Sequence, residues 1–151
     1  MRFLYFFIMF SFAFTGFSQT KEESANTMVK EFFKAFNQQD SVKLKSFAFE
    51  EVELKSIVKN DQGKMVVHTD TYDNFISNIV NIPREVNFEE RLGIVEIKTD
   101  GYLASVWVPY EFYLNEELSH CGVNIFQLIY TQKGWKIISL FDTRKKQACK
   151  Y

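Results

Sequence analysis

Apolar residues recur at helical spacing near the start of the chain. In residues 21–37 the apolar positions share one face, which predicts an amphipathic helix: Ala25, Met28, Val29, Phe32 and Phe36. The T-x-x-E pattern of Thr20 and Glu23 is typical of a capping box at the start of such a helix. Asp40 can cap a second, shorter helix that ends at Phe47.

A third helix is predicted further along the chain. Apolar residues within 72–80 again form one stripe: Tyr72, Phe75, Ile76, Ile79 and Val80. Asp70 or Thr71 can cap this helix at its start, and Pro83 ends it.

Alternating apolar and polar residues predict strands in the rest of the chain. Residues 51–58 and 64–69 form a hairpin around the turn N-D-Q-G at 60–63. Four longer strands then follow as a meander: residues 86–98, 102–114, 120–130 and 135–144. Gly93 indicates a bulge in the first of these four strands, and Pro109 indicates an edge or a bulge in the second.

The predicted element order is ααββαββββ, with all three helices in the first half of the chain. Long antiparallel strands with helices gathered on one side are typical of an α+β fold. We expect a curved antiparallel or mixed sheet, closed by the helices into a cone that encloses a cavity.

The beginning of the chain has the composition of a secretory signal peptide. Arg2 precedes an apolar run from Phe3 to Phe14, and Gly16 and Ser18 are small residues placed as before a cleavage site. The run is too short for a membrane span, although a retained single-pass anchor is the alternative. We therefore expect residues 1–18 to be removed, and 19–151 to form one periplasmic or secreted domain without stable membrane insertion.

Charge and composition argue against several kinds of partner. The chain has 18 basic and 19 acidic residues, and Arg2 is the one charged residue before position 19, so the remaining domain has a net charge of −2. Such a domain has no electrostatic footprint for nucleic acid. With two histidines and two cysteines in the chain, we expect neither a metal nor another cofactor. His68 lies near Asp70 and Asp73, where surface exposure is expected in preference to a metal site.

The two cysteines, Cys121 and Cys149, can form a disulfide if the domain is exported. The strand pattern places Cys121 near Lys145, four residues before Cys149, so a tail that bends back can bring the two sulfur atoms together. The alternative is one buried thiol and one thiol in the tail.

Two segments carry a resemblance to a known superfamily. KEFFKAFNQQDSVKLKSF contains the motif A-F-N-x-x-D, and HCGVNIFQLIYTQKGWKIISLFDTR contains G-W-K-I in its hairpin. With the element order, they resemble the nuclear-transport-factor-2-like (NTF2-like) superfamily over nearly the whole domain. That group includes SnoaL-like polyketide cyclases, ketosteroid isomerases and many exported bacterial domains. The resemblance implies a cone-shaped fold but no particular function, since this fold hosts enzymes and binding proteins alike.

The resemblance permits one test of an enzymatic function. Ketosteroid isomerases use an Asp base, a Tyr donor and a protonated Asp donor. Alignment on A-F-N-x-x-D places Ser56 at the base position, Phe32 at the Tyr position and Asn124 at the second donor position. Phe32 cannot donate a hydrogen bond, and Ser56 is no general base by itself. The isomerase catalytic set is therefore absent.

The last predicted hairpin presents one graded face. Period two pairs Leu128 with Ile138 near the turn, then Phe126 with Leu140, Asn124 with Asp142, and Gly122 with Arg144. This face changes from apolar to polar away from the turn, and the analogy with the isomerases makes it the cavity face. The candidate ligand-pocket residues are Tyr110, His120, Asn124, Phe126, Leu140, Asp142 and Arg144.

These residues leave several functions open. The leading hypothesis is an exported domain that binds a small, partly apolar molecule in its cavity, without established catalysis. A SnoaL-like cyclase, isomerase or hydratase with His120 or Asp142 as acid–base group is the second. The third is an interaction or homodimerisation module that uses the outer face of the sheet, with Trp107 or Trp135. Asp142 and Arg144 can also be a solvated rim ion pair with no ligand.

Overall fold

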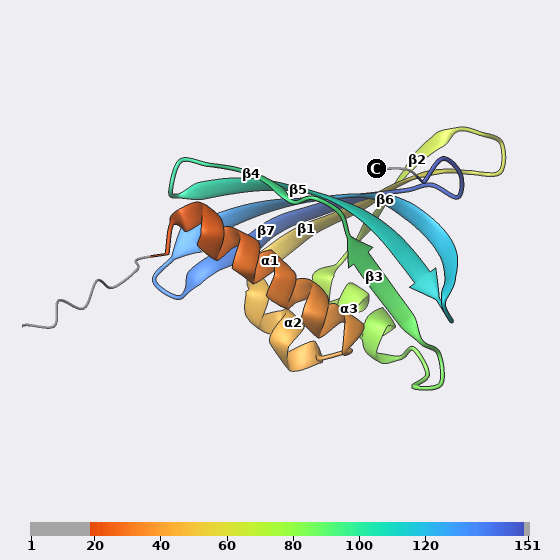
Figure 1. Cartoon of the computed structure of the whole chain (residues 1–151), viewed down its shortest axis with the longest axis horizontal. Coiled ribbons are helices and arrows are strands. Elements are labelled where there is room, and N and C mark those ends of the chain that lie inside the picture. Colours follow the sequence, from red (N-terminus) through yellow and green to blue (C-terminus); the bar gives the residue numbers. More distant parts are fainter. Residues whose placement is uncertain (1–18, 150–151) are drawn as a thin grey trace, which may run out of the picture.

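The computed structural model describes residues 19–149, so the predicted signal peptide, residues 1–18, lies outside the described part. The helices are α1 (Lys21–Asn37), α2 (Ser41–Phe47) and α3 (Tyr72–Val80), and α3 follows the first two strands. The strands are β1 (Ala48–Lys59), β2 (Met65–Asp70), β3 (Phe88–Leu92), β4 (Glu96–Thr99), β5 (Leu103–Leu114), β6 (Glu117–Thr131) and β7 (Gly134–Arg144). The predicted α+β fold is confirmed, and the helices lie together on one side of a curved sheet (Figure 1).

Each helix begins at a residue that the sequence offered as a cap. Thr20 and Glu23 form the predicted capping box, in which the backbone N–H of each donates to the side chain of the other at 2.9 and 3.1 Å. Asp40 caps α2 by accepting from the N–H of Lys43. Of the two candidates for α3, Thr71 is the cap.

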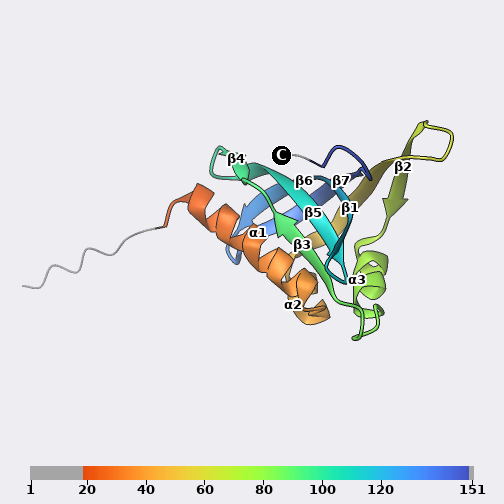
Figure 2. The same cartoon turned by 45° about the vertical axis from the view of Figure 1, so that its right-hand side comes forward.

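The sheet has seven strands in the order β2-β1-β7-β6-β5-β3, and β4 pairs with β5 beyond the end of β3. The β1–β7 pair is parallel and the other pairs are antiparallel. The sheet is therefore mixed, with the first strand placed beside the last. Turning the molecule shows α1 running across the concave face while the β1–β2 hairpin projects away from the helices (Figure 2).

The segment 86–98, expected as one strand with a bulge, forms two strands instead. β3 and β4 both pair with β5, but the ladder is interrupted between them, where Gly93 donates its N–H to the carbonyl of Pro109 at 2.8 Å. Proline has no N–H to donate in return, so the ladder cannot continue through this position. The element order therefore has one strand more than predicted.

β7 contains a bulge that the sequence did not predict. The predicted pairs Phe126–Leu140 and Asn124–Asp142 are confirmed, but Leu128 pairs with Ile137, and the expected pairing of Leu128 with Ile138 is wrong. Ile138 is the extra residue of the bulge, so the side chains before it change face. As a result Ile137 is buried in the core.

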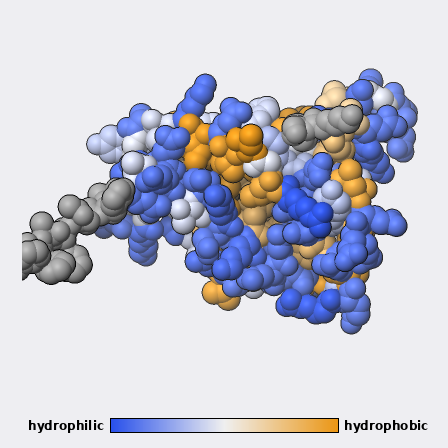
Figure 3. Space-filling view, viewed as in Figure 1, coloured by the Kyte–Doolittle hydropathy of each residue, from blue (hydrophilic) through white to orange (hydrophobic). Residues whose placement is uncertain are grey.

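An aromatic cluster joins the helices to the sheet. Phe32 of α1 makes edge contacts with Phe33, Phe47 and Phe126. Tyr72 is also buried; burial raises the pKa of its hydroxyl, which donates to the carbonyl of Leu44 at 2.8 Å. In the space-filling view, hydrophobic residues reach the surface in the middle of the viewed face, with hydrophilic residues around them (Figure 3). No helix within residues 19–149 is long and apolar enough to cross a membrane.

Candidate ligand-binding cavity

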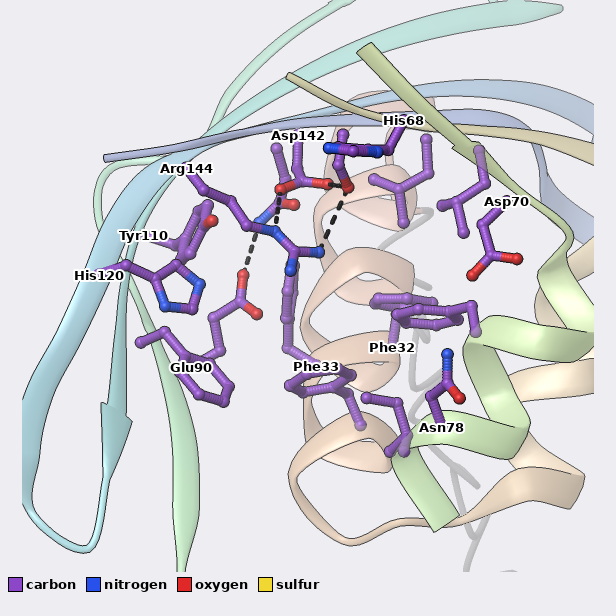
Figure 4. Close-up of a pocket in the computed structure, with 18 of the residues that line it drawn as sticks. Phe32, Phe33, His68, Asp70, Asn78, Glu90, Tyr110, His120, Asp142 and Arg144 are labelled. Carbon is purple, nitrogen blue, oxygen red and sulfur yellow. Dashed lines mark hydrogen bonds and ion pairs between the residues drawn. The ribbon is translucent and has the colours of Figure 1, made fainter. Parts of the chain in front are cut away.

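A cavity of about 590 Å³ lies between the helices and the concave face of the sheet. Figure 4 shows an aromatic side, formed by phenylalanines of α1, and a polar side on the sheet strands. The residues that line it are Phe32, Phe33, Phe36, Leu54, Ser56, Val58, His68, Asp70, Phe75, Asn78, Ile79, Glu90, Tyr110, Phe112, His120, Asn124, Leu140, Asp142 and Arg144. A concave, largely apolar space with a few convergent polar groups is the usual form of a small-molecule site.

Three side chains from β1 and β7 form a hydrogen-bonded cluster at the polar side. The parallel register places Ser56 beside Asp142, and the Ser56 hydroxyl donates to Asp142 Oδ1. Arg144 donates from Nε to Asp142 Oδ2 at 2.9 Å and from Nη2 to Ser56 Oγ at 3.2 Å. The side chain of Asp142 is 11% exposed and that of Arg144 is 52% exposed, so the ion pair extends from the cavity wall toward solvent.

The Asp142 carboxylate also governs the ionisation of Arg144. Burial lowers the pKa of the Arg144 guanidinium, but the charge and hydrogen bond of Asp142 more than offset this, and the pKa is raised. Arg144 therefore keeps its positive charge inside the cavity at every physiological pH.

A second polar pair comes from β3 and β6. Asn124 donates from Nδ2 to Glu90 Oε1 at 2.6 Å. Burial raises the pKa of the Glu90 carboxyl to about 8, the Asn124 hydrogen bond lowers it, and the charge of Asp142 raises it further. Glu90 is therefore mostly a neutral carboxylic acid at pH 7, able to donate as well as accept a hydrogen bond.

Sequence reasoning missed Glu90, although a signal was present. Phe88, Glu90 and Leu92 alternate with Glu89 and Arg91, so Glu90 lies on the apolar face of its strand. On the opposite face Glu89 and Arg91 form an exposed ion pair at 2.7 Å. A single acid between two apolar residues of one strand face indicates a carboxyl group directed into the interior.

His120 and Tyr110 also line the cavity beside this polar cluster. The His120 ring stacks on Phe112, with 4.8 Å between ring centroids, and meets the Tyr110 ring edge-on at 5.9 Å. Burial, followed by the positive charge of Arg144, lowers the pKa of His120. The imidazole is thus neutral at pH 7 and can accept a proton.

Six of the seven ligand-pocket candidates line this cavity: Tyr110, His120, Asn124, Leu140, Asp142 and Arg144. The seventh, Phe126, is 0% exposed and packs against Phe32 and Phe33 beneath the cavity wall. His68 and Asp70 of β2 and Asn78 of α3 also line the cavity, which was not foreseen. Within the described residues, no cluster of histidine, cysteine and acidic side chains could hold a metal ion.

On the outer face of the sheet lies a groove of about 930 Å³, lined in part by Trp107, Ile125 and Phe141. His120, Asp142 and Arg144 line both this groove and the inner cavity, so the two spaces adjoin at the end of β7.

The disulfide alternative for the cysteines is confirmed. Cys121 and Cys149 are bonded, with Cα atoms 5.6 Å apart and a sequence separation of 28. Cys121 also exchanges two backbone hydrogen bonds with Lys145, at 2.9 and 2.8 Å, so the tail turns back beside β6 as expected. The disulfide thereby fastens the residues that follow β7, including the groove residues Lys146 and Gln147.

The structure is similar to solved structures that share one fold. An NTF2-like protein of unknown function from Shewanella baltica OS155 matches with a TM-score of 0.62 and 12% identity, over 82% of this chain and 93% of that one. A candidate dehydratase of the NTF2-like family from Streptomyces avermitilis matches with a TM-score of 0.63 and 16% identity, over 82% and 95%. The β subunit of a candidate aromatic-ring-hydroxylating dioxygenase from Novosphingobium aromaticivorans DSM 12444 matches with a TM-score of 0.66 and 9% identity, over 83% and 90%.

These similarities show that the chain has the NTF2-like fold, as the sequence motifs predicted. No protein-family model matches the chain, and no curated protein matches it in sequence. The three positions aligned with isomerase catalytic groups, Phe32, Ser56 and Asn124, all line the cavity. Their side chains differ from those of the isomerases, so the cavity has its own chemistry.

Proposed function

We propose that the chain is an exported domain that binds a small, partly apolar molecule in its cavity. The observation that carries this proposal is the open space of about 590 Å³ between an aromatic wall and a polar cluster. The apolar part of the ligand packs against Phe32, Phe33 and Phe75, where burial of its surface supplies the affinity. Its polar atoms meet Asn124 and Arg144, which set its orientation.

Two features support export. The apolar run that follows Arg2 has the composition of a signal peptide, and the domain contains a disulfide between Cys121 and Cys149. Disulfides persist mainly in oxidising compartments such as the periplasm or the cell exterior. Both features support our proposal that the binding domain functions outside the cytoplasm.

Mass spectrometry of the purified native protein tests the binding proposal. A co-purified small molecule is expected, and Asn124→Ala or Arg144→Ala should lower its occupancy more than either lowers stability. Gln127→Ala is the matched control, because Gln127 lies on β6 but bonds to Ser105 instead of lining the cavity. If the two cavity variants lose stability while occupancy is unchanged, these residues have a structural role and the proposal is wrong.

An acid–base enzyme is the second candidate function, and the ionisation of two cavity groups favours it. Burial raises the pKa of Glu90 to about 8 and lowers the pKa of His120, so one cavity holds a neutral acid and a neutral base. Such a pair suits a cyclase, isomerase or hydratase, with His120 as the base. Asp142, the other sequence candidate, is already bonded to Ser56 and Arg144 and suits a positioning role.

Incubation separates this enzyme from a pure binding protein. If the protein is an enzyme, the co-purified compound or its analogues change mass or isomeric form in its presence, and His120→Ala abolishes the change while binding persists. A compound that is bound and released unchanged supports the first function and contradicts the second.

An interaction or homodimerisation module is the third possibility, and the outer groove supports it. Trp107 is 45% exposed there, beside Ile125 and Phe141, and exposed apolar patches often mark interaction sites. Trp135 does not contribute, because its indole N–H donates to Lys21 and Ser24 beneath α1. The mass of the protein in solution, compared with that of Trp107→Lys, distinguishes a dimer through this face from a monomer.

A further inference from the structure

The polar side of the cavity contains one ion pair without net charge, and it contains hydrogen-bond donors that are not all bonded within the protein. Asp142 and Arg144 neutralise each other, while Glu90 and His120 are uncharged near pH 7 for the reasons given above. Arg144 bonds through Nε and Nη2 only, and within residues 19–149 its Nη1 has no hydrogen-bond partner. Among the same residues, Oε2 of Glu90 has no hydrogen-bond partner either, because Asn124 donates to Oε1.

We propose that the ligand of this cavity is an amphipathic carboxylic acid, whose carboxylate binds between the guanidinium of Arg144 and the carboxyl group of Glu90. This inference rests on the proposed binding function and names the chemical class of the ligand. The guanidinium of Arg144 lies between the carboxyl groups of Asp142 and Glu90 and points into the cavity (Figure 4). A carboxylate placed there meets two unused donors, Nη1 of Arg144 and the acid O–H of Glu90.

These two donors favour an anion over other polar groups. A guanidinium has five N–H donors, so Arg144 can hold a second carboxylate while it keeps its bonds to Asp142 and Ser56. Hydrogen bonds to an ionised acceptor are about twice as strong as neutral ones. A cationic ligand would meet Arg144 at the same place and be repelled by it.

The aromatic wall of the cavity indicates what the apolar part of the ligand is. Beyond the polar side, the wall is aromatic and comes from two helices, with Phe32 and Phe33 on α1 and Phe75 on α3. Such a wall excludes water and packs against an aromatic or branched aliphatic body. The expected ligand is thus a compact acid with one anionic end and no second charge.

The proposed contact makes binding depend on pH. Glu90 faces Asn124 and His120 of β6, Asp142 and Arg144 of β7, and Tyr110 of β5. When Glu90 ionises, near pH 8, it no longer donates and it repels the carboxylate. Affinity for an acid should therefore be nearly constant from pH 6.5 to 7.5 and then fall by up to about tenfold per pH unit above 8.

Calorimetric titration of the whole protein with matched probes tests this inference. The probes are 2-naphthoic acid and 4-phenylbutyric acid, each with its own amide, at pH 6.5, 7.5, 8.5 and 9.5. At pH 6.5 each acid should bind at least about tenfold more tightly than its amide. Equal or tighter binding of both amides would overturn the assignment of a carboxylate.

Two variants locate the effect. Glu90→Gln keeps a donor but cannot ionise, so acid affinity should stay within a few-fold at pH 6.5 and the fall above pH 8 should disappear. Glu89→Gln, on the opposite face of β3, is the control and should retain the wild-type pH profile. An unchanged fall in Glu90→Gln would show that Glu90 does not hold the proton involved.

Arg144→Gln should weaken each acid by at least about tenfold and each amide by only a few-fold. Should circular dichroism show that this variant fails to fold, Arg144→Lys is the second variant: it keeps the charge but loses the planar fork of donors, so each acid should still weaken several-fold more than its amide. Equal weakening of acid and amide would contradict the role of Arg144.

The probes also separate this inference from the function on which it rests. If the amides bind as well as the acids, the cavity binds small molecules and the carboxylate assignment alone is wrong. If no probe binds at millimolar concentration and no compound co-purifies, the binding function itself is wrong, and the inference falls with it.

Discussion

At Gly122, β6 passes close to atoms of β5 and β7. Tyr110 lies directly opposite it on β5, and the Tyr110 hydroxyl donates to the carbonyl of Thr143 at 2.9 Å. A Cβ added to Gly122 would lie 1.7 Å from that carbonyl oxygen and 2.9 Å from the Tyr110 ring. The absence of a side chain at Gly122 thus allows this tyrosine to cross the strand and reach β7.

Gly122→Ala should therefore destabilise the fold strongly, by about 3 kcal/mol or more, because the clash involves backbone that cannot move freely. Gly93→Ala is the control: its new Cβ would lie 3.2 Å from Pro109 Cβ, and its cost should be under about 1 kcal/mol. Urea unfolding of both variants measures the difference. Equal, small losses would mean that β6 and β7 can separate without cost.

Glu90 should make the stability of the protein depend on pH. Its pKa is raised to about 8 in the folded protein, above the value near 4 of an unfolded chain, so folding favours the protonated form. The stability contributed by protonated Glu90 is complete below pH 4 and is lost as pH rises toward 8.

Glu90→Gln should consequently be more stable than wild type at pH 8–9, by roughly 1–3 kcal/mol, and this advantage should vanish near pH 4. Unfolding by urea across this range provides the measurement, with Glu89→Gln as the exposed control. Parallel stability profiles for wild type and Glu90→Gln would show that Glu90 is ionised in the folded protein at neutral pH.

β7 shows at the level of an element what the sequence can and cannot predict. Its outer half alternates as expected, and Leu140 and Asp142 share the cavity face with Phe126 and Asn124. The half near the turn has the opposite phase, because the bulge at Ile138 adds one residue. In the segment W-K-I-I-S-L, either alternation places apolar residues on the buried face, so hydrophobicity alone cannot locate the bulge.

The helices were predicted more closely than the strands, for a physical reason. Their caps and apolar faces are local features, as Thr20, Asp40 and Thr71 show. The break between β3 and β4 and the partners of Glu90 depend instead on residues far away in sequence, such as Pro109 and Asn124. Most of the cavity face could be predicted because it follows period two along β6 and β7.

The disulfide should stabilise the end of β7. A bond that closes a segment of 28 residues restricts the unfolded chain and typically contributes about 2–4 kcal/mol. Cys149→Ser should lower the free energy of unfolding by this amount, and a reductant should lower that of wild type similarly. The variant itself should not respond to the reductant. A variant as stable as oxidised wild type would show that the backbone bonds between Cys121 and Lys145 hold the tail alone.

For the molecule as a whole, the predicted signal peptide can be tested directly. Expressed in a bacterium, the chain should be recovered outside the cytoplasm, beginning at Gln19 and with its cysteines oxidised. A variant that lacks residues 2–18 is the control and should stay in the cytoplasm with reduced cysteines. Intact mass and thiol labelling of each fraction measure both outcomes. A full-length chain in the membrane fraction would instead establish the retained anchor.

The wall shared by the inner cavity and the outer groove has a thermodynamic consequence. His120, Asp142 and Arg144 line both spaces, so a ligand that shifts Arg144 inside also changes the surface outside. If a molecule seated in the groove changes the affinity of the cavity through these residues, the cavity ligand must change the affinity of the groove by the same factor. The end of β7 is therefore a place where binding on one face of the sheet can change the affinity for a ligand on the other face.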